Sequence, residues 1–307
     1  MSAPSASEYV LLSAQSYYYY RKEGISRSLD GQRSDTGLQS LTTEQIPGLE
    51  GWSVDLLRSY TDPDSGFSAT VFQKNGQYVV AYRGTDDWRE GQGDKEQNDT
   101  FAPGYIRELT DAPGIGEQTL DALAVVQRMI ASGISLNNIS FTGHSLGAGL
   151  AGIAGAFFGR PAVMFDPAPI KFQLDVLARY VSDRILFSEP NPFEGYPSFY
   201  EWMDSELSES EIRNLFSTRL ESYSSVYRIQ GEVLDLLDDP DRGYYHVAEE
   251  NYIKIDLGDS QLQDSPILSS AWSILTSLLG SGLIDQSQKM TVAARATAEK
   301  KAFGHRS

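Results

Sequence analysis

The stretch FTGHSLGAG, residues 141–149, sets one serine between two glycines at a fixed spacing. Gly143, Ser145 and Gly147 match the pattern Gly-x-Ser-x-Gly, which can hold a serine on a sharp turn between a strand and a helix. Residues 139–142, Ile-Ser-Phe-Thr, are interpreted as a short buried strand. The alanines and glycines after Ser145 would let a helix lie close against a sheet. The sequence therefore predicts a strand–turn–helix unit with Ser145 as a candidate nucleophile, and a purely structural turn is the alternative.

The rest of the chain alternates between strand-like and helix-like segments. Asn75 and Gly76 join two segments of strand character, which predicts a β-hairpin over 67–82. Further strands are expected at 161–166, 226–230 and 252–255, and helices at 5–22, 117–132, 171–180 and 208–223. This alternation predicts a single α/β domain with a mostly parallel central sheet and helices on both faces.

Three segments stand apart from this alternation. Residues 1–60 are interpreted as an N-terminal extension, in which the helix is followed by a long polar loop at 24–50. Residues 188–223 open with a proline-rich stretch and are interpreted as an insertion. Residues 265–284 carry no charge and are long enough to span a bilayer. They are rich in Ser, Thr and Gly, however, which predicts a buried or interfacial helix and no stable transmembrane insertion.

Composition excludes some partners and some chemistry. The chain has 25 Lys and Arg against 42 Asp and Glu, a net charge of −17, so the phosphates of a nucleic acid would be repelled. There is no cysteine, which excludes disulfides, zinc–thiolate sites and thiol catalysis. The first residues lack the basic and long apolar parts of a signal peptide. We expect a protein that is secreted or exported by a signal-peptide-independent route, with a cytoplasmic location as the alternative.

A second motif stands at the end of the predicted hairpin. Arg83, Gly84 and Thr85 directly follow its second strand. Together with GHSLGA at 143–148, this motif resembles the class 3 lipases, the fungal-type triacylglycerol lipases and their bacterial relatives. The resemblance covers roughly residues 65–255.

The resemblance implies an α/β-hydrolase fold with a lid at 89–113. It also implies an oxyanion hole, formed by the backbone N–H and hydroxyl of Thr85 and by the backbone N–H of Leu146. For Thr85 the alternative is a residue that caps a turn at the strand end. No metal and no organic cofactor is expected.

The acid of a catalytic triad is expected after the next core strand of the family. Glu232 stands where the family normally has an aspartate, and a carboxylate one methylene longer can still orient a histidine. Asp235 is the competing acid, and Asp166 is a third candidate. The acidic residues at 238–241 are expected to form a solvated turn and not a calcium site.

Three histidines compete for the role of catalytic base. His144 lies within the serine motif and is interpreted as scaffold. His246 follows the acid in the usual chain order of serine, acid and histidine, but the resemblance assigns its Gly-Tyr-x-His segment to scaffold. His305 follows a long helical stretch near the end of the sequence. We therefore predict His305 as the base, with His246 as the alternative.

Together these residues predict a serine esterase of the lipase or phospholipase A type. Ser145 would attack an ester carbonyl, a histidine would take and return the proton, and Glu232 would hold the imidazole. The resemblance implies glycerolipid or phospholipid substrates at a membrane interface, and the acidic charge favours a neutral or zwitterionic lipid. One rival is an acyl hydrolase or transferase acting on soluble esters or thioesters. The other is a catalytically inactive relative that only binds.

Overall fold

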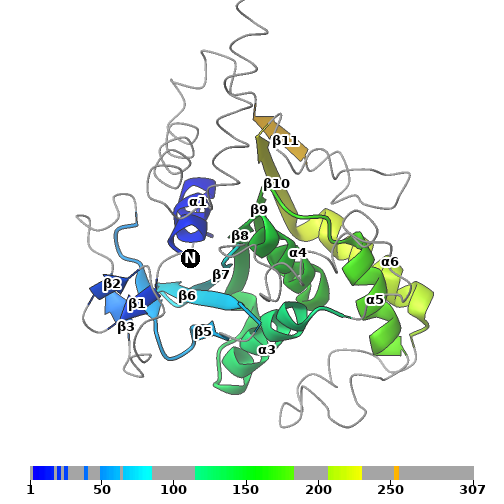
Figure 1. Ribbon diagram of the computed structural model, residues 1–307, viewed down its shortest axis with the longest axis horizontal. Helices are drawn as coiled ribbons and strands as arrows, with labels where there is room; N and C mark the ends of the chain where they lie inside the picture. The colour runs from blue at the N-terminus through cyan, green and yellow to red at the C-terminus, as the bar shows by residue number, and fades with distance from the viewer. Residues whose placement is uncertain are drawn as a thin grey trace, which may run out of the picture.

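Among the described residues, a nine-stranded mixed sheet forms the centre of the protein (Figure 1). The computed structural model describes residues 3–16, 19–21, 24–26, 38–40, 49–62, 65–84, 115–182, 207–229 and 252–255. The strand order is β11-β10-β9-β8-β7-β6-β4-β3, and β5 also pairs with β6. The strands are β3 (Leu38–Ser40), β4 (Ser53–Asp55), β5 (Tyr60–Thr61), β6 (Ser68–Lys74), β7 (Gln77–Tyr82), β8 (Ile139–His144), β9 (Ala162–Phe165), β10 (Ser224–Ile229) and β11 (Tyr252–Ile255).

The sheet has a parallel half and an antiparallel half. Strands β7 to β11 run parallel, whereas β3 to β7 pair antiparallel. The predicted hairpin is confirmed as β6 and β7, with Asn75 and Gly76 at positive φ in its turn. The parallel strands end at one common edge, here called the carboxyl edge, which is where open α/β sheets hold their ligands. A separate two-stranded antiparallel sheet consists of β1 (Tyr19–Arg21) and β2 (Gly24–Ser26).

Helices cover both faces of the sheet (Figure 1). Because successive side chains of a strand point to opposite faces, Val79 and Ala81 of β7 pack with α1, while Val80 and Tyr82 pack with α3 and α4. This arrangement is the α/β-hydrolase fold predicted from the sequence. The helices are α1 (Ala6–Gln15), α3 (Glu117–Ala131), α4 (Leu146–Phe158), α5 (Lys171–Ser182) and α6 (Glu209–Tyr223), and a short 3-10 helix η1 spans Leu136–Asn138.

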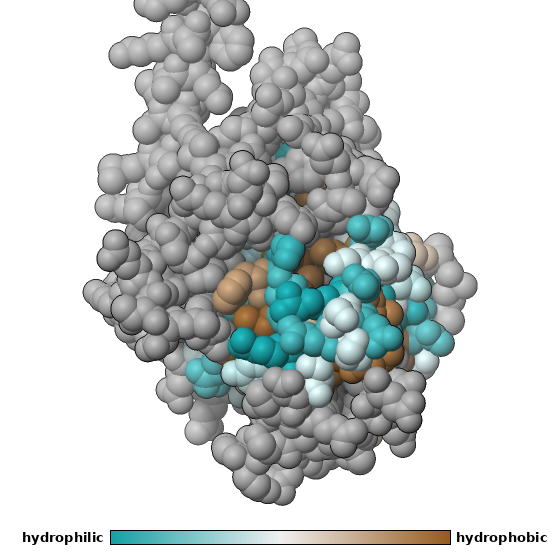
Figure 2. Space-filling model, turned by 90° about the vertical axis from the view of Figure 1, so that its right-hand side faces the viewer, coloured by the Kyte–Doolittle hydropathy of each residue, from teal (hydrophilic) through white to brown (hydrophobic). Residues whose placement is uncertain are grey.

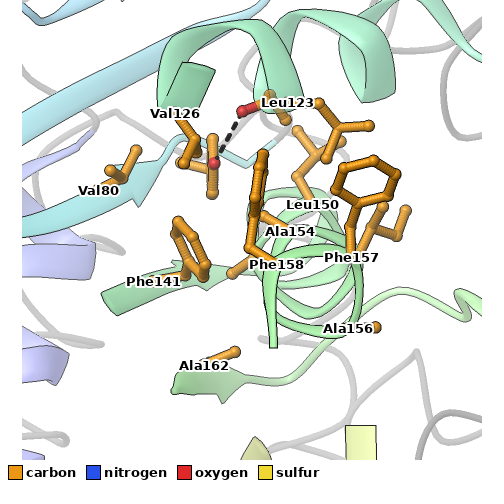
Figure 3. Packing of buried hydrophobic residues seen from close by; sticks show 14 of the residues in the cluster. Val80, Leu123, Val126, Phe141, Leu150, Ala154, Ala156, Phe157, Phe158 and Ala162 are labelled. Carbon is orange, nitrogen blue, oxygen red and sulfur yellow. Dashed lines mark hydrogen bonds between the residues drawn. The ribbon is translucent and has the colours of Figure 1, made fainter. Parts of the chain in front are cut away.

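The larger core lies between the sheet and helices α3 and α4 (Figure 3). Phe141 of β8, Phe158 of α4 and Val126 of α3 are buried there. Burial of each such side chain contributes about 1.5–3 kcal/mol. The one polar group of the buried Tyr82 is also satisfied, because its hydroxyl donates to the carbonyl oxygen of Ala122 at 3.0 Å.

The N-terminal helix, in the predicted extension, packs against the central sheet. The helix predicted over 5–22 is confirmed for its first part, α1, which ends at Gln15. Its last part is wrong, because β1 begins at Tyr19. Aromatic residues are enriched in strands, and the two tyrosines of β1 therefore favour a strand over a continued helix. Tyr9 and Leu12 of α1 are buried in a second core with Trp52. The loop predicted at 24–50 likewise contains strands β2 and β3.

Helix α6 also belongs to the core. The helix predicted at 208–223 is confirmed, and it buries Ile212, Phe216 and Leu220 in the same cluster as α4. The ring centroids of Phe216 and Phe157 lie 5.9 Å apart. Where α5 and α6 form the outer surface, Figure 2 shows mainly hydrophilic residues. Within the predicted insertion, α6 is therefore a regular helix between β9 and β10 that packs on the core.

Candidate active site

A single residue, Ser145, makes the turn from β8 into α4 at the carboxyl edge. β8 ends at His144 and α4 begins at Leu146. Ser145 has φ 56° and ψ −124°, a conformation rare for a residue with a side chain and costing about 1–3 kcal/mol. Such strain persists only where the surroundings hold the residue in place. The predicted strand–turn–helix unit is thus confirmed, with Ser145 at its corner.

The two glycines of the motif let α4 approach the sheet. A Cβ on Gly143 would lie 2.3 Å from the carbonyl carbon and oxygen of Gly147. A Cβ on Gly147 would lie 2.2 Å from the carbonyl oxygen of Tyr82 and 2.7 Å from the carbonyl carbon of Arg83. Any side chain at either position would collide with backbone. The first turn of α4 therefore rests directly on the end of β7.

Hydrogen bonds hold the peptide groups of Ser145 on two sides. Its N–H donates to the carbonyl oxygen of Phe165 at 3.0 Å, which continues the β8–β9 ladder. Its carbonyl oxygen accepts from Ala148 at 3.0 Å and Gly149 at 3.1 Å within α4. The same oxygen accepts from the N–H of Ala168 at 3.1 Å, in the connection between β9 and α5. Both neighbouring elements thus fix the backbone that carries the Ser145 hydroxyl.

His144 is neutral at neutral pH. Burial lowers the pKa of its imidazole from 6.5 to about 4, because a charged ring would lose its solvation. His144 is the last residue of β8 and is partly buried. A neutral ring with this pKa fits the scaffold role expected from the sequence.

The turn at Ser145, here called the serine elbow, lies beside the end of β7. Leu146 is the first residue of α4, where a backbone N–H has no acceptor within the helix. The helix dipole adds positive potential at the same end. Arg83, which follows β7, is buried, and its Nη2 donates to the carbonyl oxygen of Gly66 at 2.7 Å. Its backbone N–H donates to the carbonyl oxygen of Ser68 at 2.9 Å, so the strand end that leads to Gly84 is held firmly.

Asp166, the third acid candidate, lies at the end of the strand next to the elbow. It directly follows β9 and is 4 % exposed. Its φ is 45°, in the left-handed region, and its N–H donates to the carbonyl oxygen of Tyr227 at 2.9 Å. No sequence motif singles out Ala168, two residues further on. The proline on each side of Ala168 was the available signal, because prolines have no N–H to donate.

The other predicted site residues lie outside the described residues. They are Thr85, Glu232, Asp235, His246 and His305, together with the lid segment 89–113 and the uncharged segment 265–284. No helix within the described ranges is long and apolar enough to span a bilayer. The same ranges hold no group of three His, Asp or Glu side chains that could bind a metal ion.

Known proteins share the region that contains this site. Residues 9–179 match a family model described as phospholipase-like, a Tle-like phospholipase domain. An extracellular phospholipase A1 of Serratia liquefaciens is 32 % identical over 143 residues, which are 47 % of this chain and 39 % of that protein. The match thus spans about two fifths of the length of that curated relative. The family-model match begins at residue 9, within α1, well before residue 65, where the motif resemblance starts.

Solved esterase structures are more distant. A hormone-sensitive lipase from a metagenome library is 15 % identical, with a TM-score of 0.30 over 76 % of this chain and 86 % of that chain. An esterase of the bacterial hormone-sensitive lipase family is 13 % identical, with a TM-score of 0.31 over 94 % of this chain and 100 % of that chain. The family model, by contrast, covers more than half of the 307 residues and includes α1, both hairpin strands and the serine elbow. The chain therefore belongs to the phospholipase-like family that carries the Tle-like phospholipase domain.

Proposed function

We propose that the protein is a serine ester hydrolase that acts on lipid esters, as a lipase or a phospholipase A. The observation that carries this proposal is the geometry of Ser145. It stands alone between β8 and α4 at positive φ, at the edge of the sheet where α/β enzymes bind ligands. Strain of this kind concentrates at functional sites. A purely structural turn at this position would not require it.

The proposed chemistry is acyl transfer to water. The Ser145 hydroxyl attacks the ester carbonyl, and a histidine takes its proton and returns it to the leaving alcohol. Water then hydrolyses the acyl-enzyme through the same base. We propose His305 as this base, with His246 as the alternative. Glu232 is the proposed acid that orients the imidazole, with Asp235 as the alternative.

The proposed oxyanion hole combines the N–H of Leu146 with donors from Thr85. Two observations support it. The first turn of α4 lies against Arg83, two positions before Thr85. The N–H of Leu146 also belongs to a helix N-terminus, which favours a developing negative charge.

The proposed substrate is a neutral or zwitterionic lipid at a membrane interface. Family membership and the phospholipase A1 relative support an acyl ester of a phospholipid or glycerolipid. The motif likeness to the class 3 lipases supports the same substrate class and a lid at 89–113. The net charge of −17 disfavours strongly anionic surfaces. The relative is described as extracellular, which supports export of this protein.

Hydrolysis by wild type and by Ser145→Ala tests this proposal. Both proteins are assayed on phosphatidylcholine vesicles, on a short-chain soluble ester and on a thioester. Ser145→Ala should lose roughly 10³-fold or more in kcat. The matched control is Ser135→Ala, at an exposed serine before η1, which should leave kcat unchanged.

The pattern of substrates separates the alternatives. Serine-dependent release of fatty acid from vesicles supports a phospholipase. Turnover of the soluble ester or thioester alone would assign the enzyme to soluble acyl compounds. If the folded wild type turns over none of the three substrates, the protein is an inactive relative.

A further inference from the structure

The connection between β9 and α5 reaches back to the nucleophile position. The carbonyl oxygen of Ser145 accepts three N–H groups, two from its own helix and one from Ala168. The helix donors follow from the start of α4. The third donor comes from a different element and depends on how the chain leaves β9.

The chain leaves β9 by a left-handed corner at Asp166. The N–H of Asp166 still extends the sheet, because it donates to the carbonyl oxygen of Tyr227 at 2.9 Å. The φ of 45° then turns the chain sharply. Pro167 and Pro169 flank Ala168 and lack N–H groups. Ala168 is therefore the only possible backbone donor of this three-residue stretch, and it is buried with its N–H on the Ser145 carbonyl.

Hydrogen bonds link the two residues of the carboxyl edge that have positive φ, Ser145 and Asp166, through the neighbours of Asp166. Asn75, Ser145 and Asp166 are the described residues other than glycine with positive φ. Asn75 is explained by the hairpin turn. The other two are joined by a pair of hydrogen bonds on either side of Asp166, from Ser145 N–H to Phe165 and from Ala168 N–H to Ser145. These two hydrogen bonds therefore couple the backbone position of Ser145 to that of Asp166.

We propose that Asp166 is a positioning residue for the nucleophile and not the acid of the triad. Its left-handed backbone aims the Ala168 N–H at the Ser145 carbonyl and so fixes the orientation of the Ser145 hydroxyl. This inference rests on the proposed function of Ser145. Asp, Asn and Gly all tolerate the left-handed region, whereas β-branched residues do not. The role therefore requires the backbone conformation of the residue and not its negative charge.

Four substitutions separate backbone from charge: Asp166→Asn, Asp166→Gly, Asp166→Ala and Asp166→Val. The measurements are kcat and KM on a short-chain ester, the pH profile of kcat, and circular dichroism to check folding. Asp166→Asn and Asp166→Gly should stay within a few-fold of wild type. Asp166→Val should lose about 10–100-fold in kcat with little change in KM, because a small misplacement of a reacting group has effects of that size. Asp166→Ala should lie between these two.

A second readout does not depend on turnover. Hydrogen exchange of the Ala168 N–H, followed by NMR, should be slow in wild type and in Asp166→Asn, and faster in Asp166→Ala. Ser145→Ala should leave this protection unchanged. If wild type lacks Ser145-dependent hydrolysis, the proposed function fails, and with it the role in positioning a nucleophile, whereas the exchange data still decide whether Asp166 maintains the hydrogen bond from Ala168 to Ser145.

Two results would overturn the inference. If Asp166→Asn loses kcat as severely as Ser145→Ala with an altered pH profile, the carboxylate takes part in catalysis. If Ala168 stays protected and kcat stays high in both Asp166→Ala and Asp166→Val, the corner does not position Ser145.

Discussion

The hydroxyl of Tyr9 donates a hydrogen bond to Oγ of Ser140 at 2.9 Å, which joins α1 to the strand that leads into the serine elbow. Ser140 in turn donates to the carbonyl oxygen of Tyr78, at 3.4 Å. Tyr9 is 5 % exposed, so its hydroxyl is largely shielded from water. Helix α1 is thereby tied to the parallel half of the sheet, which carries Ser145.

Tyr9→Phe should lower the free energy of unfolding by about 1 kcal/mol, because it leaves the buried Ser140 hydroxyl without its donor. Urea unfolding measures this change. Tyr223→Phe is the matched control, since Tyr223 is 45 % exposed at the end of α6, and it should have almost no effect. Equal effects of the two substitutions would show that α1 is not held by this bond.

The pH dependence of stability should carry a contribution from Glu8. Burial alone would raise the pKa of Glu8, but hydrogen bonds from Lys74, Trp52 and Ser5 outweigh it and lower the pKa from 4.5 to about 2. The carboxylate is therefore favoured in the folded state. Its contribution is complete above about pH 4.5 and is lost as the pH falls towards 2.

Glu8→Gln should remove this part of the acid sensitivity. Because the Glu8 side chain remains 20 % exposed, solvent screening should keep the effect below about 1 kcal/mol. Urea unfolding of wild type and variant should differ near pH 5 and converge near pH 2. The control is Glu221→Gln, at an exposed residue of α6. A constant difference between wild type and Glu8→Gln at all pH values would contradict the assignment.

The serine elbow was predictable because its signals are local. The glycine spacing, the strand-like residues before Ser145 and the small residues after it all lie within a short stretch of sequence. The docking of α1 was not predictable in the same way, because Tyr9 and Ser140 are 131 positions apart. Composition also did not predict that α6 packs in the core, since its buried residues Ile212, Phe216 and Leu220 are separated by mostly polar residues.

The surroundings of Ser145 depend on sheet register, which the sequence does not display. Ala168 reaches the Ser145 carbonyl only because β8 and β9 pair with His144 opposite Phe165. Local patterns pointed to Asp166 as one acid among three. Its left-handed backbone, seen only in the folded chain, indicates a different role. The assignments of Glu232 and His305 rest on family likeness and stay predictions.

Asp121 should destabilise the protein above about pH 6. The pKa of this carboxyl is raised from 3.8 to about 6, chiefly by burial and also by the charges of Asp62 and Glu117, against the hydrogen bond from Ser65 and the charge of Arg128. The folded state therefore binds the proton more tightly than the unfolded chain. Stability due to this group falls as the pH rises from about 4 to 6.

Asp121→Asn should raise the free energy of unfolding at about pH 8 by about 1 kcal/mol, after allowance for solvent screening. At about pH 4 the gain should largely disappear, because the folded wild type is then protonated. The amide oxygen can still accept from the Ser65 hydroxyl, which donates to Asp121 at 3.0 Å. A loss of stability at the higher pH would show that the charged form is the favoured one.

Gly147→Ala should damage activity more than stability. The added Cβ would lie 2.2 Å from the carbonyl oxygen of Tyr82 and 2.8 Å from that of Arg83. These are backbone atoms, so the first turn of α4 must move away from β7. Overpacking of this kind costs about 1–3 kcal/mol. The shift also carries the N–H of Leu146 away from the proposed oxyanion hole, where loss of one donor typically costs about 10²–10³ in kcat.

Gly152→Ala is the matched control, because it adds the same methyl group to the same helix. Its Cβ would lie 2.6 Å from Sδ of Met164 and 2.9 Å from Cδ1 of Ile170, which are the ends of flexible side chains that can move aside. It should therefore lose stability with little change in kcat. Thermal unfolding and ester hydrolysis of both variants give the comparison. If kcat falls equally in both, the activity loss reflects general loosening of α4, and the contact of Gly147 with the end of β7 has no special part in the site.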